Sequence, residues 1–256
     1  MNAGHGILAV ASFQLRRLLT PQRVILAALG AAFPAAVMLA VRRIAGDLDR
    51  DFAVVLLYAL LPEALCLLGL LVTMCPVVAD ELERNTWQHV AVRPWGRWSL
   101  LLGTFLAAVS WTATVALFAL GLTLVAAGLP GSGRLAAVFA ALILVSCIGR
   151  AALFALPAVI MPKRAIVASV AVALVVEYLA GFLPAVVNQL TVSLRLRSLL
   201  VRWMGWERAL PTELALLVDT QPAWVQIMAV VALATVMLVA AGVILARRQF
   251  PPAEGS

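Results

Sequence analysis

Six long apolar runs, separated by short stretches that hold the charged residues, dominate this chain of 256 residues. A helix needs about 20 apolar residues to cross the hydrocarbon core of a bilayer, and each run is long enough to do so. The runs cover residues 24–41, 53–79, 99–128, 135–161, 165–187 and 224–246. The sequence therefore predicts an all-α polytopic membrane protein with six transmembrane helices.

Composition agrees with this class and limits the number of domains. The chain is 64% hydrophobic and 12% charged, with a mean hydropathy of +1.05, whereas soluble chains average about 45–50% apolar and about 25% charged residues. Six spans use most of the chain, so we expect a single transmembrane domain over residues 1–256. No G-x-x-x-x-G-K-[ST] phosphate loop occurs, so any ATP-driven work must come from another chain.

The polar residues give little support to catalysis. The net charge of +7 comes mainly from arginines scattered over the loops, which suits membrane lipids better than nucleic acid. The three cysteines lie in apolar runs, and the two histidines have no neighbouring ligands in a recognisable arrangement. We expect no catalytic residue, no metal site and no cofactor bound by this chain. A Mg²⁺ site on Asp80, Glu81 and Glu83 is the alternative, but a helix end rich in carboxylates explains these residues more simply.

Two amphipathic segments flank the spans. Residues 5–20 predict a helix that lies in the membrane interface before the first span. We expect Arg16 and Arg17 on it to contact lipid phosphates, and contact with a partner protein is the alternative. Residues 188–223 predict further interfacial helices on the outer side, before the last span. An even number of spans puts both termini on one side, and the loop arginines and lysine favour the cytoplasmic side of a cell membrane by a narrow margin. The tail from Phe250 to Ser256 is expected to be short and disordered.

The loop over residues 80–98 is the most informative segment. Acidic residues follow the second run directly, a Thr86-Trp87 pair comes next, and a Pro94-Trp95-Gly96 break precedes the third run. These features predict a short cytoplasmic helix set across the ends of two spans.

This loop resembles the one that joins the second and third spans in permease subunits of ABC-2 type transporters. Their loop reads like E-x-E-x-G-T-[LW]-[EQ]-x-L, then a proline, a basic or aromatic patch, and L-L-x-G-K. The matching residues here are Glu81, Glu83, Thr86, Trp87, Gln88, Pro94, Arg97 and Gly103. Asn85 stands in place of the glycine and Thr104 in place of the lysine. The plan of the whole chain is also similar to that of the family.

The resemblance implies a half-transporter that acts in a dimer with an identical or related permease half. Its cytoplasmic loop would dock into a cleft of a separate ABC ATPase subunit, which would bind the ATP and Mg²⁺. Closure of two ATPase subunits would then rock the two halves apart and export a lipid, a glycan or a hydrophobic small molecule. The implied docking residues are Glu81, Glu83, Thr86, Trp87, Val90, Arg93 and Pro94, with Trp87 and Val90 as the docking side chains.

Three charged residues lie inside the apolar runs, where insertion scales put the cost of one charge at about 2.5–3.5 kcal/mol. Arg150 and Glu177 both lie roughly 16–18 Å from the Lys163 loop at about 1.5 Å per residue, which predicts an ion pair. The pair either locks two helices or forms a polar patch or gate on a translocation path. If Glu177 were removed alone, we expect more damage than if both were removed, because Arg150 would be left unpaired.

Glu63 lies nearer the outer side, beside Pro62. It could line a polar cavity, carry a proton in a hydrogen bond, or reach the interface through a local kink. An alternative function follows from the three charges together: a stand-alone secondary transporter that uses Glu63, Arg150 and Glu177 as coupling charges.

Overall fold

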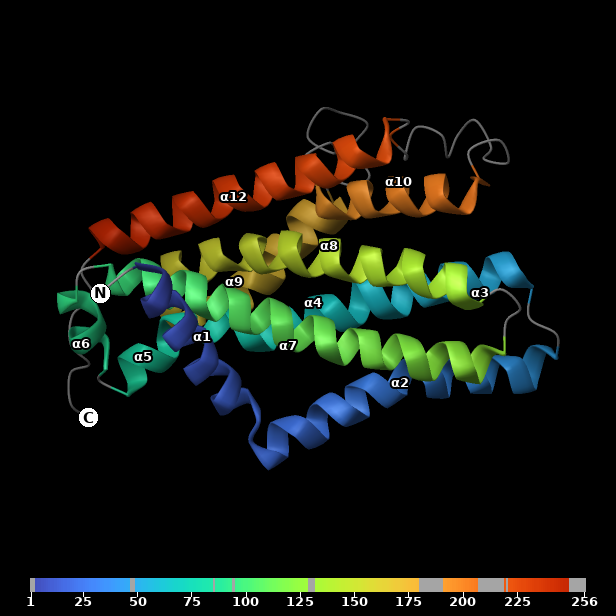
Figure 1. Cartoon of the computed structure of the whole chain (residues 1–256), viewed down its shortest axis with the longest axis horizontal. Helices are drawn as coiled ribbons and strands as arrows, with labels where there is room; N and C mark the ends of the chain where they lie inside the picture. Colours follow the sequence, from blue (N-terminus) through green and yellow to red (C-terminus); the bar gives the residue numbers. More distant parts are fainter. Residues whose placement is uncertain are drawn as a thin grey trace.

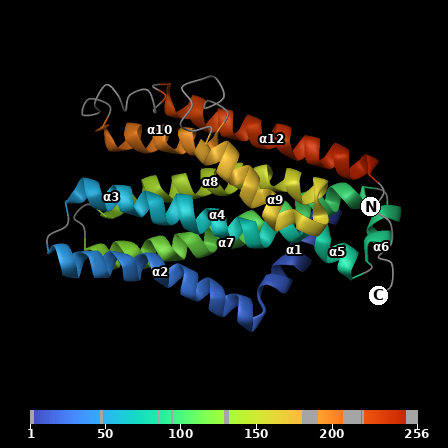
Figure 2. The same cartoon turned by 180° about the vertical axis from the view of Figure 1, so that it is seen from behind.

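The structure, a computed structural model, describes residues 3–46, 49–84, 86–93, 95–128, 132–179, 191–206, 219 and 221–248. Within these ranges the chain is helical and contains no strand. Figures 1 and 2 show a long bundle of helices seen from two opposite sides. The expected all-α class is therefore confirmed for the described residues. Asn85, Pro94 and the C-terminal tail lie outside them.

Five helical stretches are long and apolar enough to cross a membrane. The five are α2 (Pro21–Ala45), the stretch Arg50–Val77, α7 (Gly96–Ala127), α8 (Ser132–Ile160) and α12 (Ala223–Arg247). The stretch Arg50–Val77 consists of four consecutive elements: α3 (Arg50–Tyr58), η1 (Ala59–Leu65), α4 (Cys66–Met74) and η2 (Cys75–Val77). They coincide with five of the six expected runs. The run at 165–187 is described only as far as Leu179, as α9 (Ala165–Val172) and η4 (Ala173–Leu179).

Shorter helices complete the described part of the chain. These are α1 (Ala3–Leu18), α5 (Ala79–Glu83), α6 (Trp87–Val92), η3 (Pro162–Arg164) and α10 (Val192–Met204). Helix α10 falls within the amphipathic segment expected over residues 188–223, and it buries the apolar side chains of Val192, Leu196 and Leu199. Residues 188–190, 207–218 and 220 of that segment lie outside the described residues.

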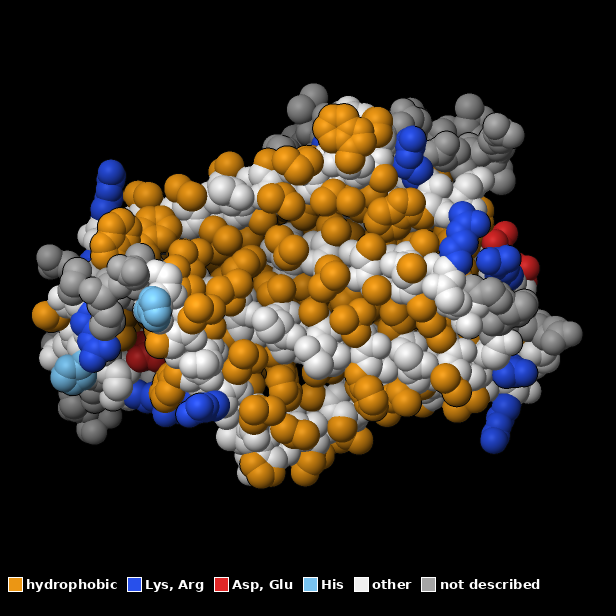
Figure 3. Space-filling model, viewed as in Figure 1, with side chains coloured by type: hydrophobic (Ala, Val, Ile, Leu, Met, Phe, Trp, Pro, Cys, Tyr) orange, Lys and Arg blue, Asp and Glu red, His pale blue; other side chains and the backbone are white. Residues whose placement is uncertain are grey.

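Helix α8 forms the centre of the bundle. In its most apolar 18-residue window 67% of the residues are buried, against 17% in α2 and 22% in α12. Side chains from α4, α7, α10 and α12 pack around it. Helices at the edge instead expose apolar side chains over the middle of the molecule, while lysines and arginines gather at the two ends (Figure 3). This distribution fits a multi-pass membrane protein, whose surroundings are apolar in the middle and polar at both ends.

The two ends of the bundle differ in what they carry. We name them the α6 end and the α3 end. The α6 end holds α5, α6 and the end of α12 (Figure 1), and Arg248 there donates to the carbonyls of Val159, at 3.1 Å, and Ile160. At the α3 end, Arg134 donates to the carbonyl of Trp203 at 2.9 Å. Arginines at both ends thus bond to helix carbonyls that the helices themselves leave without partners.

Helix α1 lies directly against α7 because Gly103 has no side chain. A Cβ at Gly103 would come 2.7 Å from the Cβ of Val10 and 2.9 Å from the carbonyl oxygen of Ile7. Both distances are shorter than van der Waals contact, so even alanine would push the two helices apart. A Cβ at Gly121, farther along α7, would have no atom of a neighbouring helix within 4 Å.

Replacement of Gly103 by alanine should therefore destabilise the protein, by about 1–3 kcal/mol for an overpacked contact. The matched change Gly121→Ala should be neutral or stabilise the helix by up to about 1 kcal/mol. Thermal unfolding of both variants in detergent micelles measures the difference. Equal midpoints would contradict the close packing of α1 on α7.

Candidate functional site

The three charged residues of the apolar runs meet in the interior of the bundle, and we call Glu63, Arg150 and Glu177 the charge cluster. Arg150 projects from α8 and is fully buried. Its Nη2 forms an ion pair with the Glu63 carboxylate and lies 3.9 Å from Oε2 of Glu177. The expected pairing of Arg150 with Glu177 is confirmed, but Glu63 is the nearer partner. The expectation that loss of Glu177 leaves Arg150 unpaired is wrong, because Glu63 remains.

Hydrogen bonds from Arg150 reach well beyond the two carboxylates. Its Nη1 donates to the Pro62 carbonyl, to the Glu63 carbonyl at 3.2 Å and to Ser146 Oγ at 3.0 Å. Its Nη2 also donates to Ser193 Oγ at 3.2 Å. Only Nε has no partner among the described residues. Dense hydrogen bonding of this kind is what a buried guanidinium requires, since its desolvation otherwise outweighs the charge attraction.

Glu177 lies at the beginning of α10 and caps that helix from another segment. It accepts hydrogen bonds from the backbone N–H of Val192 at 3.1 Å and of Ser193 at 2.8 Å, and from Ser193 Oγ at 2.5 Å. The first N–H groups of a helix have no partner within the helix, and its dipole favours an anion there. Glu177 therefore has favourable contacts that do not depend on Arg150.

Both glutamates of the cluster lie in π-helical segments, Glu63 in η1 and Glu177 in η4. Such segments are rare, and they occur often at functional sites. In η1 the carbonyl of Pro62 accepts from Ser146 Oγ at 2.8 Å as well as from Arg150. The hydroxyl of Tyr58 donates to Glu63 Oε1 at 2.7 Å. Two carboxylates and one guanidinium leave the cluster with one excess negative charge when all three are ionised.

The loop between the second and third long helices forms a compact structure at the α6 end, and we call residues 79–95 the α5–α6 loop. Arg17 of α1 pairs with Asp80 at 2.6 Å and with Glu81 at 3.6 Å. Arg17 thus contacts the protein itself, whereas lipid phosphate was its expected partner. These ion pairs connect α1 to α5.

Glu81 and Thr86 bond to each other inside this loop. The Thr86 hydroxyl donates to the Glu81 carboxylate, and the Thr86 N–H donates to the Glu81 carbonyl at 3.0 Å. Only 7% of Glu81 is exposed. The two residues therefore hold the shape of the loop, and Glu81 contributes little to its outer surface.

Trp87 also faces inward, with 6% of its surface exposed. The guanidinium of Arg97 lies over its ring at 5.8 Å from the centroid. The same guanidinium donates to the α12 carbonyls of Leu245, at 3.3 Å, and Ala246. Trp87 is therefore not available as a surface docking side chain in this structure, and it braces the loop against α7 and α12.

Other residues of the loop do face outward. Glu83 and Arg93 are exposed, while Val90 is partly buried against the core. Val92 and Trp95 are the large apolar side chains that stand out, with 84% and 65% of their surfaces exposed. The sequence placed Trp95 in the break before the third run but assigned no docking role to Trp95 or Val92, although apolar residues beside a proline break were the available signal.

The described residues contain no group of three or more histidine, cysteine, aspartate or glutamate side chains that could hold a metal ion. A scan against protein-family models finds no family that matches this chain, and a search of curated proteins finds no match.

The charge cluster predicts strong non-additivity between its members. Arg150→Leu leaves the buried carboxylate of Glu177 and the partly buried carboxylate of Glu63 without their counter-charge, and it should cost about 3–5 kcal/mol of unfolding free energy. Arg150→Leu combined with Glu63→Leu should recover part of this loss, since Glu177 keeps its bonds to α10. Chemical unfolding in detergent measures both, with the exposed Arg43→Leu as control. A double variant that is less stable than Arg150→Leu would rule out the pairing.

Glu177→Leu tests the capping contact separately. It should cost less than Arg150→Leu because Arg150 keeps Glu63, but it should loosen the beginning of α10. Hydrogen exchange of the Val192 and Ser193 amides should accelerate in this variant. Unchanged exchange at these two amides would show that Glu177 does not cap the helix.

Proposed function

We propose that this chain is the transmembrane permease subunit of an ATP-binding cassette exporter, driven by a separate ATPase subunit that docks on the α5–α6 loop. The observation that carries the proposal is the bracing of this loop. Arg17 links it to α1, and Arg97 links it through Trp87 to α7 and through two carbonyls to α12. A push on the loop would therefore move three helices, which is what a part that receives force from an ATPase needs.

The outer face of the loop supplies the contact surface. Val92 and Trp95 offer exposed apolar area, and Glu83 and Arg93 surround it with charge. A small apolar centre with a polar rim is the usual anatomy of a protein interface. In this arrangement Glu81, Thr86 and Trp87 act from inside by fixing the loop, and Val90 packs beneath it. Pro94 belongs to the same stretch but lies outside the described residues.

The rest of the proposal follows the family plan. Under this proposal the apolar run at 165–187, of which residues 180–187 lie outside the described part of the chain, is the sixth crossing. One domain of six spans then covers the chain, with both termini on the cytoplasmic side of the cell membrane. Helix α1 lies at the interface, and α10 belongs to the outer region. Two identical or related halves form the transporter, and the substrate is a lipid, a glycan or a hydrophobic small molecule. ATP and Mg²⁺ bind the partner, while this chain performs no covalent chemistry.

The charge cluster favours a second candidate, a stand-alone secondary transporter. Its two carboxylates and one guanidinium lie in the interior and are joined by hydrogen bonds across η1, α8, η4 and α10. An excess carboxylate in such a place can take up and release a proton. Transport by the purified chain in liposomes, driven by a proton gradient with no ATPase present, would select this function over the first.

A pull-down from native membranes tests the exporter directly. The tagged wild-type chain should recover an ATP-binding cassette ATPase, identified by mass spectrometry. The loop variants Val92→Asp and Arg93→Glu should each reduce its recovery about tenfold or more, equivalent to about 1.4 kcal/mol of binding free energy. Arg43→Glu, an exposed arginine at the α3 end, serves as control.

The same experiment can refute the proposal. Absence of any ATPase from the wild-type eluate would exclude a stable docked partner. Full recovery with both loop variants would exclude this face of the loop as the contact.

A further inference from the structure

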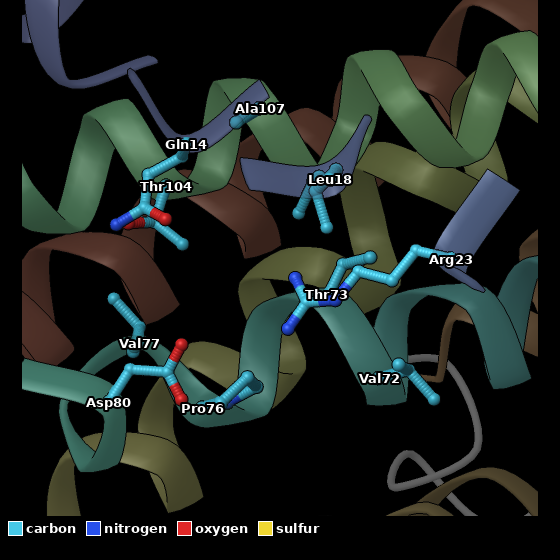
Figure 4. Close-up of a pocket in the computed structure, with 11 residues that line it drawn as sticks. Gln14, Leu18, Arg23, Val72, Thr73, Pro76, Val77, Asp80, Thr104 and Ala107 are labelled. Carbon is cyan, nitrogen blue, oxygen red and sulfur yellow. The ribbon is translucent and has the colours of Figure 1, made fainter. Parts of the chain in front are cut away.

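A small pocket lies toward the α6 end of the bundle, where α1 and α2 approach α7, α4 and α5. Its polar lining consists of Gln14, Arg23, Thr73, Asp80 and Thr104, and Figure 4 shows these side chains around a common space. The empty volume is about 370 Å³, part of it open to the outside. The enclosed part is narrow and has room for a group about the size of a water molecule.

Thr104 gives the first indication that the pocket holds a ligand. Its side chain is buried, with 5% of the residue exposed, and its hydroxyl has no partner among the described residues. Hydroxyls in membrane helices usually donate to the carbonyl four residues earlier, as Thr73 does to Gly69 at 2.8 Å. A buried hydroxyl without a partner costs about 1–3 kcal/mol, and a group bound in the pocket would remove that cost.

The charges around the pocket give the second indication. Arg23, in the first turn of α2, is exposed and has no ion-pair partner among the described residues. Asp80 binds Arg17 through Oδ2, while its Oδ1 accepts no hydrogen bond within the described part of the chain. In Figure 4 the Arg23 guanidinium and the Asp80 carboxylate extend into the same space. The pocket therefore offers a donor cation at its rim and a carboxylate oxygen farther in, which suits a zwitterion.

The surroundings of the rim are apolar. Leu19, Ile25 and Leu26, close to Arg23 in the chain, expose 60%, 61% and 63% of their surfaces. Exposed leucine and isoleucine beside an arginine form the setting in which a lipid places its chains against protein and its phosphate on the arginine.

We propose that this pocket binds the headgroup of an ethanolamine phospholipid. The primary ammonium enters the narrow part, where it donates to Asp80 Oδ1 and to the hydroxyl oxygen of Thr104. The phosphate lies at the rim on Arg23, and the acyl chains follow the apolar side of α2. A trimethylammonium group is larger than a water molecule and has no N–H to donate, so choline lipids fit poorly. Anionic lipids without an amine leave Oδ1 of Asp80 without a hydrogen-bond donor, since Arg17 binds only Oδ2. This site does not depend on the proposed transport function.

Native mass spectrometry of the purified full-length chain tests the site. The protein, stripped of lipid in detergent, is offered equal amounts of phosphatidylethanolamine, phosphatidylcholine and phosphatidylglycerol with the same acyl chains. We expect phosphatidylethanolamine to be retained about tenfold more than either competitor, a difference of about 1.4 kcal/mol. Thr104→Val and Arg23→Gln should each remove most of this preference. The matched controls Thr114→Val, exposed on α7, and Arg43→Gln, exposed on α2, should keep it. Size-exclusion profiles check that every variant is folded.

Four outcomes would overturn the assignment. Equal retention of the choline and ethanolamine lipids would exclude an ammonium pocket, and a preference for phosphatidylglycerol would make the site anion-selective. Displacement of the lipid by soluble phosphoethanolamine at equal concentration would make the ligand a free metabolite. An unchanged lipid preference in the Thr104→Val variant would mean that the Thr104 hydroxyl of the wild-type protein contacts a water molecule and not the lipid.

Discussion

The Arg150 guanidinium is the interaction on which the interior of this molecule depends. It lies at the centre of the most buried helix and contacts Glu63 and Ser193 directly, with Glu177 within ion-pair distance. These residues come from η1, α10 and η4, three segments that lie far apart in the sequence. A cation in an apolar interior is unfavourable unless nearly all of its donors are used. Arg150 therefore makes the correct mutual placement of these segments a condition for a stable bundle.

The two π-helical segments have a physical role in that arrangement. Each segment adds one residue to a helical turn at the point where a glutamate side chain reaches the centre of the bundle. In η1, Pro62 has no backbone N–H, so regular α-helical hydrogen bonding is interrupted there. The carbonyl of Pro62 itself accepts hydrogen bonds from Arg150 and Ser146. Irregular backbone inside an apolar interior is tolerated only where such partners exist. The irregular backbone and the charges therefore support each other.

Apolar periodicity and run length predicted the helical class and the position of five long helices, because these depend on local composition. The equal distances of Arg150 and Glu177 from the Lys163 loop along their helices also predicted the contact between them. The spacing did not predict Glu63 as the nearer partner, because the π-helical segment η1 changes the position of Glu63 along the bundle and is not visible in the sequence. The inward orientation of Trp87 escaped prediction for a related reason. A tryptophan at a loop is amphipathic, and the position of Arg97 relative to α12 decides which way it faces.

The order of the partners along the chain has a consequence for biogenesis. Glu63 precedes Arg150 by 87 residues, whereas Glu177 and Ser193 follow it. When the ribosome delivers α8 to the bilayer, the carboxylate of Glu63 that neutralises its arginine has already left the ribosome, while the beginning of α10 has not yet reached the bilayer. Insertion of the arginine can thus be assisted early, and the final arrangement is completed only when the later segments arrive.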